Sequence, residues 1–323
     1  MTAILDARTV SAELIGVFPT GSPAWHAARA GGIGGSEIAA VLGLSAWESH
    51  FSLWHRKKGR IPPQMENTQM EAGKRLEPVI CQKFADMHPE LWVRTTGTWR
   101  NIDRPEQIAN PDRLNYAFAH CECGARGDVL CSCPLPEVPD SLLEAKFALY
   151  PDMWGEEGTD EIPPYYKAQA RWYLDVFGLG RCYVAVFIGS TGEFREYIVE
   201  PDPEDTALMR ARAEAFLRSL RENRRPSIDG HDQTYRAVKQ LPDGVEDIVV
   251  DIGPILAGQY LDALEAYSAA KTEKQLRTSL ILDALGNARR AKALGEHIAT
   301  RAVRADGTTH SLRAARPGRE IKS

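Results

Sequence analysis

Hydrophobic and polar residues follow two different periods over the first 222 positions of the chain. Apolar residues recur every three to four positions in five segments, which predicts helices at 36–43, 48–59, 70–88, 164–177 and 203–222. Apolar or alternating runs bounded by Gly, Pro or Asp predict strands at 91–100, 107–112, 114–121, 140–149, 182–189 and 194–200. Ser36 is the expected N-cap of the first of these helices. The order of helices, strand cluster, helix, strands and helix predicts a domain of the α/β (α+β) class.

The pattern changes after this segment. Pro, Gly and polar residues without a sustained period predict a linker at 226–250. The apolar positions of 254–285 predict one long helix or two shorter ones, and 297–316 alternates around Asp306-Gly307, which predicts a hairpin. We therefore expect a core domain at 1–225, with a small helical and hairpin region at 251–323.

Composition and charge restrict the possible functions. The chain has 323 residues, 43% of them hydrophobic and 26% charged, which is typical of a globular protein and excludes disordered or collagen-like chains. Its formal charge of −5 argues against a protein that coats nucleic acid through bulk charge. The charge is uneven, since residues 271–323 hold 12 Lys and Arg against 5 Asp and Glu, a net +7 that leaves −12 elsewhere. Any contact with nucleic acid must be local.

Membrane insertion and secretion are not expected. No apolar run approaches the roughly 20 residues that span a bilayer. The first residues carry Asp6, Arg8 and Glu13, where a signal peptide has an apolar stretch. The sequence predicts a cytoplasmic protein.

Candidate catalytic chemistry lies in ANPDRL, with Asp112, and in LLEAKF, with Glu144 and Lys146. Residues two apart on a strand face the same side, so Glu144 and Lys146 project together, and a carboxylate from a preceding strand end can join them. Two carboxylates suit Mg²⁺, and a lysine can orient water or stabilise phosphoryl charge. On its own, the pattern is a weak signal, and a turn aspartate with a solvent-exposed strand face is the simpler interpretation.

Four cysteines gather in CECGARGDVLCSC, as Cys121, Cys123, Cys131 and Cys133. If the intervening GARGDVL is a hairpin turn, all four thiols converge, and four thiolates suit a tetrahedral structural Zn²⁺. Reduced cysteines in a loop and an iron-sulfur cluster remain alternatives, and His120 can replace one thiol.

Five ordered blocks, WHAARAGGIGGSEIAAVLGLS, GKRLEP, ANPDRL, LLEAKF and AQARWYLDVFGLGRCYVAVF, resemble the phage lambda-exonuclease-like family, also called YqaJ-type viral recombinases. The resemblance covers about residues 22–200. It implies the PD-(D/E)xK restriction-endonuclease-like core, a central mixed sheet flanked by helices. It also implies a Mg²⁺-dependent DNA exonuclease, with Mn²⁺ as a possible substitute. Such enzymes digest linear duplexes from 5′ ends, leave 3′ single strands for an annealing protein, and form trimers.

The resemblance assigns roles to individual residues. Asp112 and Glu144 would be Mg²⁺ ligands, Lys146 the catalytic lysine, and Glu77 of RLEP a helix-borne acid directed at the same metal. The pair Gln169 and Tyr173 resembles the Gln-x-x-x-Tyr element of RecB-type nucleases, which would support the site or the DNA strand.

Arg29, followed by GGIGGS and a helix, predicts an anion site near Ser36. The family resemblance implies that Arg29 and Ser36 bind the 5′-phosphate of the digested strand. Asn110 stands where the phage enzyme has a Ser in this pocket, which puts strict 5′-phosphate dependence in doubt. The plainer alternative is a flexible glycine turn with Ser36 as an ordinary N-cap.

Two other function classes compete with the exonuclease. One is a non-catalytic DNA-binding or recombination-accessory module that acts through the cysteine segment and the basic C-terminal region. The other is an iron-sulfur RecB-type nuclease. Metal-dependent cleavage separates the first from the leading hypothesis, and iron content separates the second.

Overall fold

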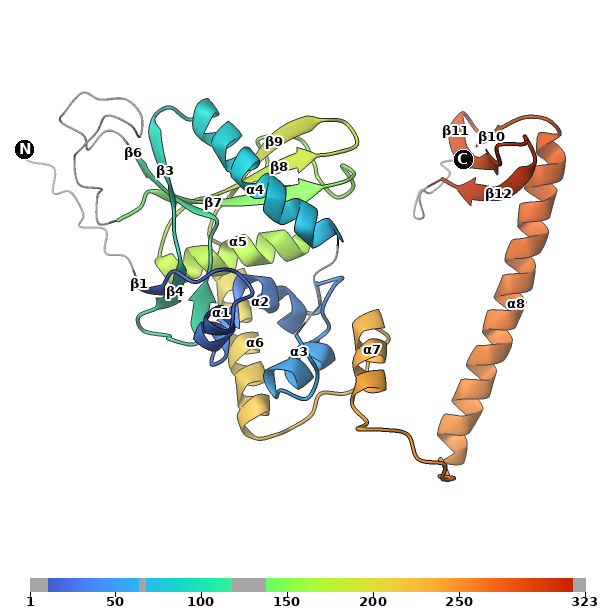
Figure 1. Ribbon diagram of the computed structural model, residues 1–323, viewed down its shortest axis with the longest axis horizontal. Coiled ribbons are helices and arrows are strands. Elements are labelled where there is room, and N and C mark those ends of the chain that lie inside the picture. The colour runs from blue at the N-terminus through green and yellow to red at the C-terminus, as the bar shows by residue number, and fades with distance from the viewer. Residues whose placement is uncertain (1–10, 64–67, 118–137, 316–323) are drawn as a thin grey trace, which may run out of the picture. The chain divides into compact units, whose positions relative to one another are not determined.

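The computed structural model describes residues 11–63, 68–117 and 138–315. The chain forms two compact units, Met1–Gly244 and Val245–Ser323, and each is described by itself. Figure 1 shows the elements of both. The cysteine segment, with Cys121, Cys123, Cys131 and Cys133, lies outside the described residues.

A five-stranded mixed sheet is the centre of the first unit (Figure 1). Its strands follow the order β3 (Leu91–Thr95), β6 (Arg113–Ala117), β7 (Ser141–Ala148), β8 (Cys182–Ile188) and β9 (Glu193–Val199). Strands β7 and β8 are parallel, and the other neighbours are antiparallel. The predicted mixed sheet is confirmed.

Helices α4 (Thr68–Met87) and α5 (Pro164–Phe177) cover the two faces of this sheet. Leu143 of β7 packs in a cluster with Ile80 and Phe84 of α4. Its neighbour Leu142 packs instead in the larger cluster that contains the buried residues of α5. Because side chains alternate along a strand, the residues in phase with Leu142 face α5.

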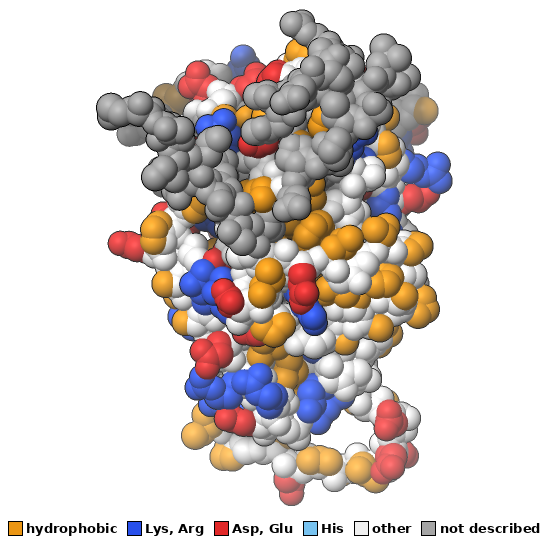
Figure 2. Space-filling view, turned by 90° about the vertical axis from the view of Figure 1, so that its left-hand side faces the viewer, with side chains coloured by type: hydrophobic (Ala, Val, Ile, Leu, Met, Phe, Trp, Pro, Cys, Tyr) orange, Lys and Arg blue, Asp and Glu red, His pale blue; other side chains and the backbone are white. Residues whose placement is uncertain are grey.

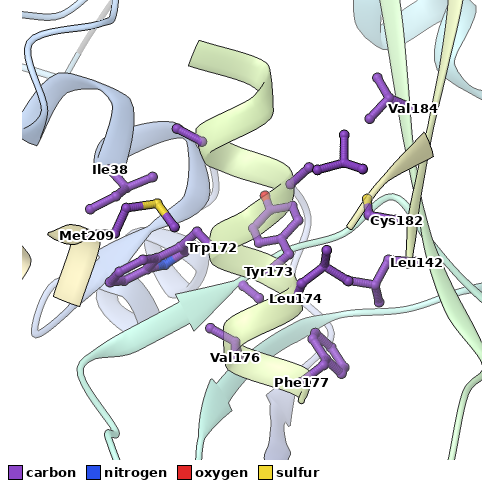
Figure 3. Close-up of a cluster of buried hydrophobic side chains, with 14 of the residues drawn as sticks. Ile38, Leu142, Trp172, Tyr173, Leu174, Val176, Phe177, Cys182, Val184 and Met209 are labelled. Atoms are coloured by element: carbon purple, nitrogen blue, oxygen red, sulfur yellow. The ribbon is translucent and has the colours of Figure 1, made fainter. Parts of the chain in front are cut away.

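Helix α5 lies between the sheet and two further helices, α2 (Gly35–Val41) and α6 (Pro203–Arg221). Figure 3 shows Trp172 directed toward Ile38 and Met209, with Tyr173 and Leu174 on the side of Leu142 and Cys182. The indole N–H of Trp172 donates to the carbonyls of Ile33 and Ile108, at 3.1 and 3.2 Å. A buried helix with both faces packed holds its polar side chains in fixed positions.

A second sheet has the order β1 (Ala12–Gly16), β4 (Thr98–Asn101), β5 (Gln107–Ala109) and β2 (Ile33–Gly34). The predicted strand at 91–100 is therefore wrong, since β3 and β4 belong to different sheets. The extended segment is interrupted at Gly97, where a Cβ would overlap the carbonyl oxygen of Gly16 on β1. This close approach turns the chain out of the first sheet and into the second.

The start of α2 also differs from the prediction. Gly34 is the N-cap, and Ser36 lies within the first turn. The Gly34 N–H donates to Glu37 Oε2 at 2.7 Å, so a carboxylate satisfies the helix end in place of a serine. The Ser36 hydroxyl is free for another partner.

Helices α1 (Pro23–Arg29), α3 (His50–Lys57) and α7 (Asp232–Gln240) complete the unit. Helix α7 lies inside the segment expected as a linker, which is a correction to that expectation. Ala237 packs with Phe51 and Ile61, and the Thr234 hydroxyl donates to Ser49 Oγ at 2.7 Å. Thr234 and Ala237 are buried, and Val238 and Leu241 pack against the same cluster. The helix has only nine residues and is flanked by polar, Pro and Gly residues, so its apolar positions do not form a sustained period.

The second unit contains α8 (Pro254–Leu285), a single helix of 32 residues, and a sheet with the order β10 (Arg290–Ala293), β11 (Glu296–Val303) and β12 (Thr309–Ala314). The predicted hairpin is confirmed in β11 and β12. Its turn uses Gly307 at a φ of +81°, a backbone conformation that favours glycine. Strand β10 was not predicted.

Among the described residues, no helix combines the length and apolarity needed to cross a bilayer. On the face of the molecule shown in Figure 2, acidic and basic side chains are interspersed. This face offers no broad surface of one charge.

Candidate active site

The centre of the candidate site is Glu144 on β7, whose side chain faces α5. Glu144 is only 4% exposed. Its Oε1 accepts from Lys146 Nζ at 2.5 Å and from Gln169 Nε2 at 2.6 Å. Lys146 Nζ also donates to Gln169 Oε1 at 3.3 Å. The structure therefore brings the predicted acid, lysine and glutamine into one hydrogen-bonded group.

Asp112 reaches the same strand from the end of β5. Its Oδ2 accepts from the backbone N–H of Ala145 at 2.7 Å, which places its carboxyl beside that of Glu144. Burial raises the pKa of Asp112 well above its ordinary value, and the nearby charge of Glu144 adds to this. Burial likewise raises the pKa of Glu144. Two carboxyl groups crowded together resist simultaneous ionisation, a situation that a bound cation relieves.

Lys146 keeps its charge in this setting. Burial alone would lower the pKa of Lys146, but the charges of Glu144, Tyr166 and Asp112 outweigh it and raise that pKa. The ammonium also lies 4.6 Å from the ring centre of Tyr166, a cation–π distance. A buried, permanently protonated lysine can stabilise negative charge on a phosphoryl group.

The two carboxylates fit a divalent cation. Glu144 Oε2 is buried and has no hydrogen-bond partner among the described residues, although its other oxygen has two. Mg²⁺ is commonly held by one or two carboxylates together with substrate phosphates. In the described part of the chain, no three His, Cys, Asp or Glu side chains gather closely enough to form a metal site. Any cation here would rely on Asp112, Glu144 and the substrate.

Glu77 was expected to join Asp112 and Glu144, but it does not. Its Oε1 accepts from Arg113 Nη1 at 2.9 Å, and its side chain is 34% exposed. Glu77 lies near enough for its charge to raise the pKa of Asp112, but the ion pair with Arg113 occupies it. Glu77 therefore lies near Asp112 and Glu144 but is paired with Arg113.

Tyr173 links this group to a second one. Gln169 Nε2 lies 3.1 Å from the Tyr173 hydroxyl, which donates to the carbonyl of Asn110 at 3.1 Å. Burial raises the pKa of Tyr173, so its hydroxyl keeps its proton and its role as donor. The predicted Gln169 and Tyr173 pair therefore connects the carboxylates to the turn before Asp112.

The second group contains the residues that were predicted to bind an anion. Arg29 directs Nη1 to Asn110 Oδ1 and Nη2 to Ser36 Oγ, each at 3.4 Å. Its guanidinium lies 4.1 Å from the ring centre of Trp25. The three residues that the sequence assigned to one pocket thus lie together, although Asn110 accepts from Arg29 instead of adding another donor toward a ligand.

Three polar residues of the site were not singled out from the sequence. Lys57 Nζ pairs with Glu37 Oε1 at 2.9 Å, and Glu37 Oε2 lies 3.9 Å from Arg29. Burial would raise the pKa of Glu37, but Lys57 and Arg29 lower it overall, so this carboxylate balances the pocket's positive charge. The sequence does contain a pattern that could have identified Tyr166, which contacts Lys146. With Gln169 and Tyr173 it forms an i, i+3, i+7 face of α5.

The mixed sheet, Asp112 directly before β6 and the Glu144-x-Lys146 pair on neighbouring β7 have the arrangement that the resemblance to PD-(D/E)xK nucleases implies. Residues 24–180 match the sequence profile of the YqaJ-like viral recombinase domain. The match covers 157 of the 323 residues and identifies this part of the chain as similar to the YqaJ-like viral recombinase domain.

Individual relatives are distant. The chain is 26% identical over 223 residues to "Uncharacterized protein YqaJ" of Bacillus subtilis (strain 168), a match that covers 67% of this chain and 62% of that protein. The chain therefore spans about three fifths of the length of this curated relative.

Among solved structures, the alkaline exonuclease LHK-Exo from Laribacter hongkongensis is 19% identical, with a TM-score of 0.44 over 68% of this chain and all of that one. The same enzyme in complex with dAMP is also 19% identical and gives a TM-score of 0.45 over 62% of this chain and 94% of that one.

Proposed function

We propose that this chain is a divalent-metal-dependent DNA exonuclease that hydrolyses phosphodiester bonds in linear duplexes. The observation that carries the proposal is the buried group of Asp112, Glu144 and Lys146, in which one Glu144 oxygen has no partner. A desolvated carboxylate with an open oxygen costs stability unless a ligand uses it. The YqaJ-like domain supports the same function, and we assign catalysis to residues 1–225.

In this proposal Asp112 and Glu144 hold the metal. When bound, Mg²⁺ or Mn²⁺ would polarise the phosphoryl oxygen and lower the pKa of a bound water. Lys146 offsets the negative charge that develops on the phosphoryl group. Gln169 donates to Glu144 and accepts from Lys146, and so fixes their relative orientation. Glu77 would become a third acid at the metal if Arg113 left it to contact the DNA.

We propose 5′-to-3′ digestion, with Arg29 and Ser36 binding the terminal 5′-phosphate. The chain of hydrogen bonds through Asn110 and Tyr173 fixes this pocket relative to the carboxylates. A phosphate held at one end orients the strand for cleavage of the adjacent bond. The products would be 3′ single strands for an annealing protein. We propose that the enzyme works in the cytoplasm and forms a homo-oligomer, a trimer by family analogy.

Substitutions on β7 test the proposal. Glu144→Gln and Lys146→Ala should each reduce Mg²⁺-dependent degradation of a linear duplex by at least about 100-fold. Lys167→Ala is a matched control, because Lys167 lies on α5 but pairs with Asp160 at the surface. Full activity in the Glu144→Gln and Lys146→Ala variants would refute the site.

A structural Zn²⁺ held by Cys121, Cys123, Cys131 and Cys133 is a separate proposal that rests on their spacing in the sequence. Elemental analysis of the purified full chain should find about one zinc per chain, lost in a Cys121→Ser/Cys123→Ser variant. Iron would instead favour a cluster, and a chain without either metal would leave reduced cysteines.

A further inference from the structure

The second unit contains a cavity whose lining is basic. Its volume is about 440 Å³, and it is lined by Arg289, Arg290, Lys292, His297 and Thr300. No carboxylate contributes to this lining. The cavity lies on the sheet of β10, β11 and β12, far along the chain from the residues of the candidate active site.

Strand register places the cations on one face of this sheet. Arg290 of β10 pairs with Thr300 of β11, and Thr300 pairs with Arg313 of β12. Directly paired residues of antiparallel strands project to the same side. The three side chains therefore form a row across the sheet. Lys292 pairs with His297, which extends the basic face along the strands.

The opposite face of the sheet has a structural role. Ala299 is only 2% exposed. Arg301 donates to the carbonyls of Leu282 and Gly286, at 3.0 and 2.6 Å, and so satisfies the end of α8. Arg301 therefore stabilises the contact between this sheet and α8, and the cations of the opposite face take no part in that contact.

Basic residues outnumber acidic ones in this part of the chain. Residues 286–315 hold six Lys and Arg against Glu296 and Asp306. Asp306 Oδ1 accepts from Thr308 in the hairpin turn. Within the described chain, no side-chain hydrogen bond or ion pair is found for Arg290, Lys292 or Arg313. Arg290 lies about 7 Å along β10 from Lys292 and, with β11 between them, about 10 Å across the sheet from Arg313, so the three cations share one face and repel one another until an anion binds.

We propose that this face, formed by Arg290, Lys292 and Arg313 with Thr300 and His297, binds the phosphate backbone of duplex DNA. The proposal rests on the proposed nuclease function, because it assigns to the second unit the task of holding the substrate. Arginine and lysine contact phosphates without reading sequence, and the Thr300 hydroxyl adds a neutral hydrogen-bonding group. Several cations arranged in a row suit a polymer of phosphates better than a single small anion.

Binding of a short fluorescent duplex by the full chain in EDTA tests the proposal, because without metal no cleavage is needed. The variant Arg290→Gln/Lys292→Gln/Arg313→Gln should bind more weakly. The slope of log affinity against log salt should fall by about 3, one for each phosphate contact. Lys271→Gln/Lys274→Gln/Arg277→Gln, on α8, removes the same charge and should leave the slope unchanged. Arg290→Lys should retain binding, since it keeps the charge.

Three results would overturn this inference. They are an unchanged slope in the sheet variant, equal losses in both triple variants, and tighter binding to anionic lipid vesicles than to the duplex. Each leaves the proposed nuclease intact if the chain still degrades DNA with Mg²⁺. Conversely, a chain that binds DNA through this face but never cleaves it would refute the proposed function and leave the inference standing.

Discussion

The proposed metal site depends on Glu144 more than on any other residue. One of its oxygens accepts from both Lys146 and Gln169, whereas the other is buried without a partner. Burial of a carboxylate disfavours its charged form, and its pKa is raised accordingly. We propose that this oxygen serves a bound cation, because the carboxyl of Asp112 lies beside that of Glu144.

Asp112 should make the metal-free protein less stable as pH rises. Its folded pKa lies well above the ordinary 3.8, so the unfolded chain loses this proton at lower pH than the folded chain does. Stability contributed by the protonated carboxyl is therefore lost as pH rises from about 4 through the folded pKa. In EDTA, Asp112→Asn should melt at a higher temperature than the native chain near pH 8, with a smaller difference near pH 5. A lower Tm for the variant near pH 8 would contradict the proposed repulsion.

Arg29 should determine the preference for phosphorylated ends. Arg29→Gln should reduce digestion of 5′-phosphorylated duplex by about 10- to 100-fold, the loss of one or two charge-assisted hydrogen bonds. Digestion of 5′-hydroxyl ends should change little. Rates on the two substrates check this. Equal rates on both kinds of end in the native chain would contradict the proposed 5′-phosphate pocket at Arg29.

Local spacing was enough to predict part of the site. Glu144 and Lys146 share a face because the strand period is two, which needs no tertiary information. The engagement of Glu77 by Arg113 was not predictable, since it joins residues 36 positions apart across a helix and a strand. Ser36 was expected as an N-cap because serine favours that position, but Glu37 satisfies the helix end instead.

At the scale of elements, the contact between α2 and α5 should be the most sensitive to side-chain volume. A Cβ at Gly35 would overlap the buried ring of Tyr173, and it would also press on Gln169. Gly35→Ala should lower stability by about 1–3 kcal/mol, as overpacking does, and should also reduce nuclease activity.

The matched control is Gly31→Ala, because a Cβ at Gly31 meets nothing within 4 Å. Urea unfolding of both variants, together with their activities, checks the prediction. Equal stability of the two variants would show that α5 is not held in the position described.

Element prediction succeeded where one period dominates. Helix α5 begins and ends at the predicted residues, because Pro164 opens it and Gly178 ends it in a left-handed conformation. Strands β1 and β2 were missed since each is short and pairs with distant segments. Helix α7 was missed because it has only nine residues, too few for a sustained period. In each case, tertiary contacts decided the structure.

At the scale of the whole molecule, the boundary after Gly244 predicts a separable core. Helix α8 buries none of its residues, so its removal should not expose a core. A chain of residues 1–244 should unfold within about 2 °C of the corresponding transition in the full chain, a shift of under about 1 kcal/mol. It should still degrade linear DNA with Mg²⁺. Calorimetry of both chains checks this, and a large drop in Tm would contradict it.

Charge also takes on a different meaning at this scale. The formal −5 averages an acidic body with a basic C-terminal segment. Within the body, Asp112 and Glu144 would be neutralised by a metal, and in the second unit Arg290, Lys292 and Arg313 form no ion pair within the described residues. The net charge therefore excludes binding by bulk charge but permits the local contacts proposed for Arg29 and for the sheet.

The most direct measurement is the release of nucleotides from linear and covalently closed circular duplexes of the same sequence, with Mg²⁺ or with EDTA. The account predicts degradation of the linear duplex only, and only with Mg²⁺, because cleavage requires both the metal held by Asp112 and Glu144 and a free end at the Arg29 pocket. Degradation of the closed circle, or of the linear duplex in EDTA, would contradict it, as would no degradation at all.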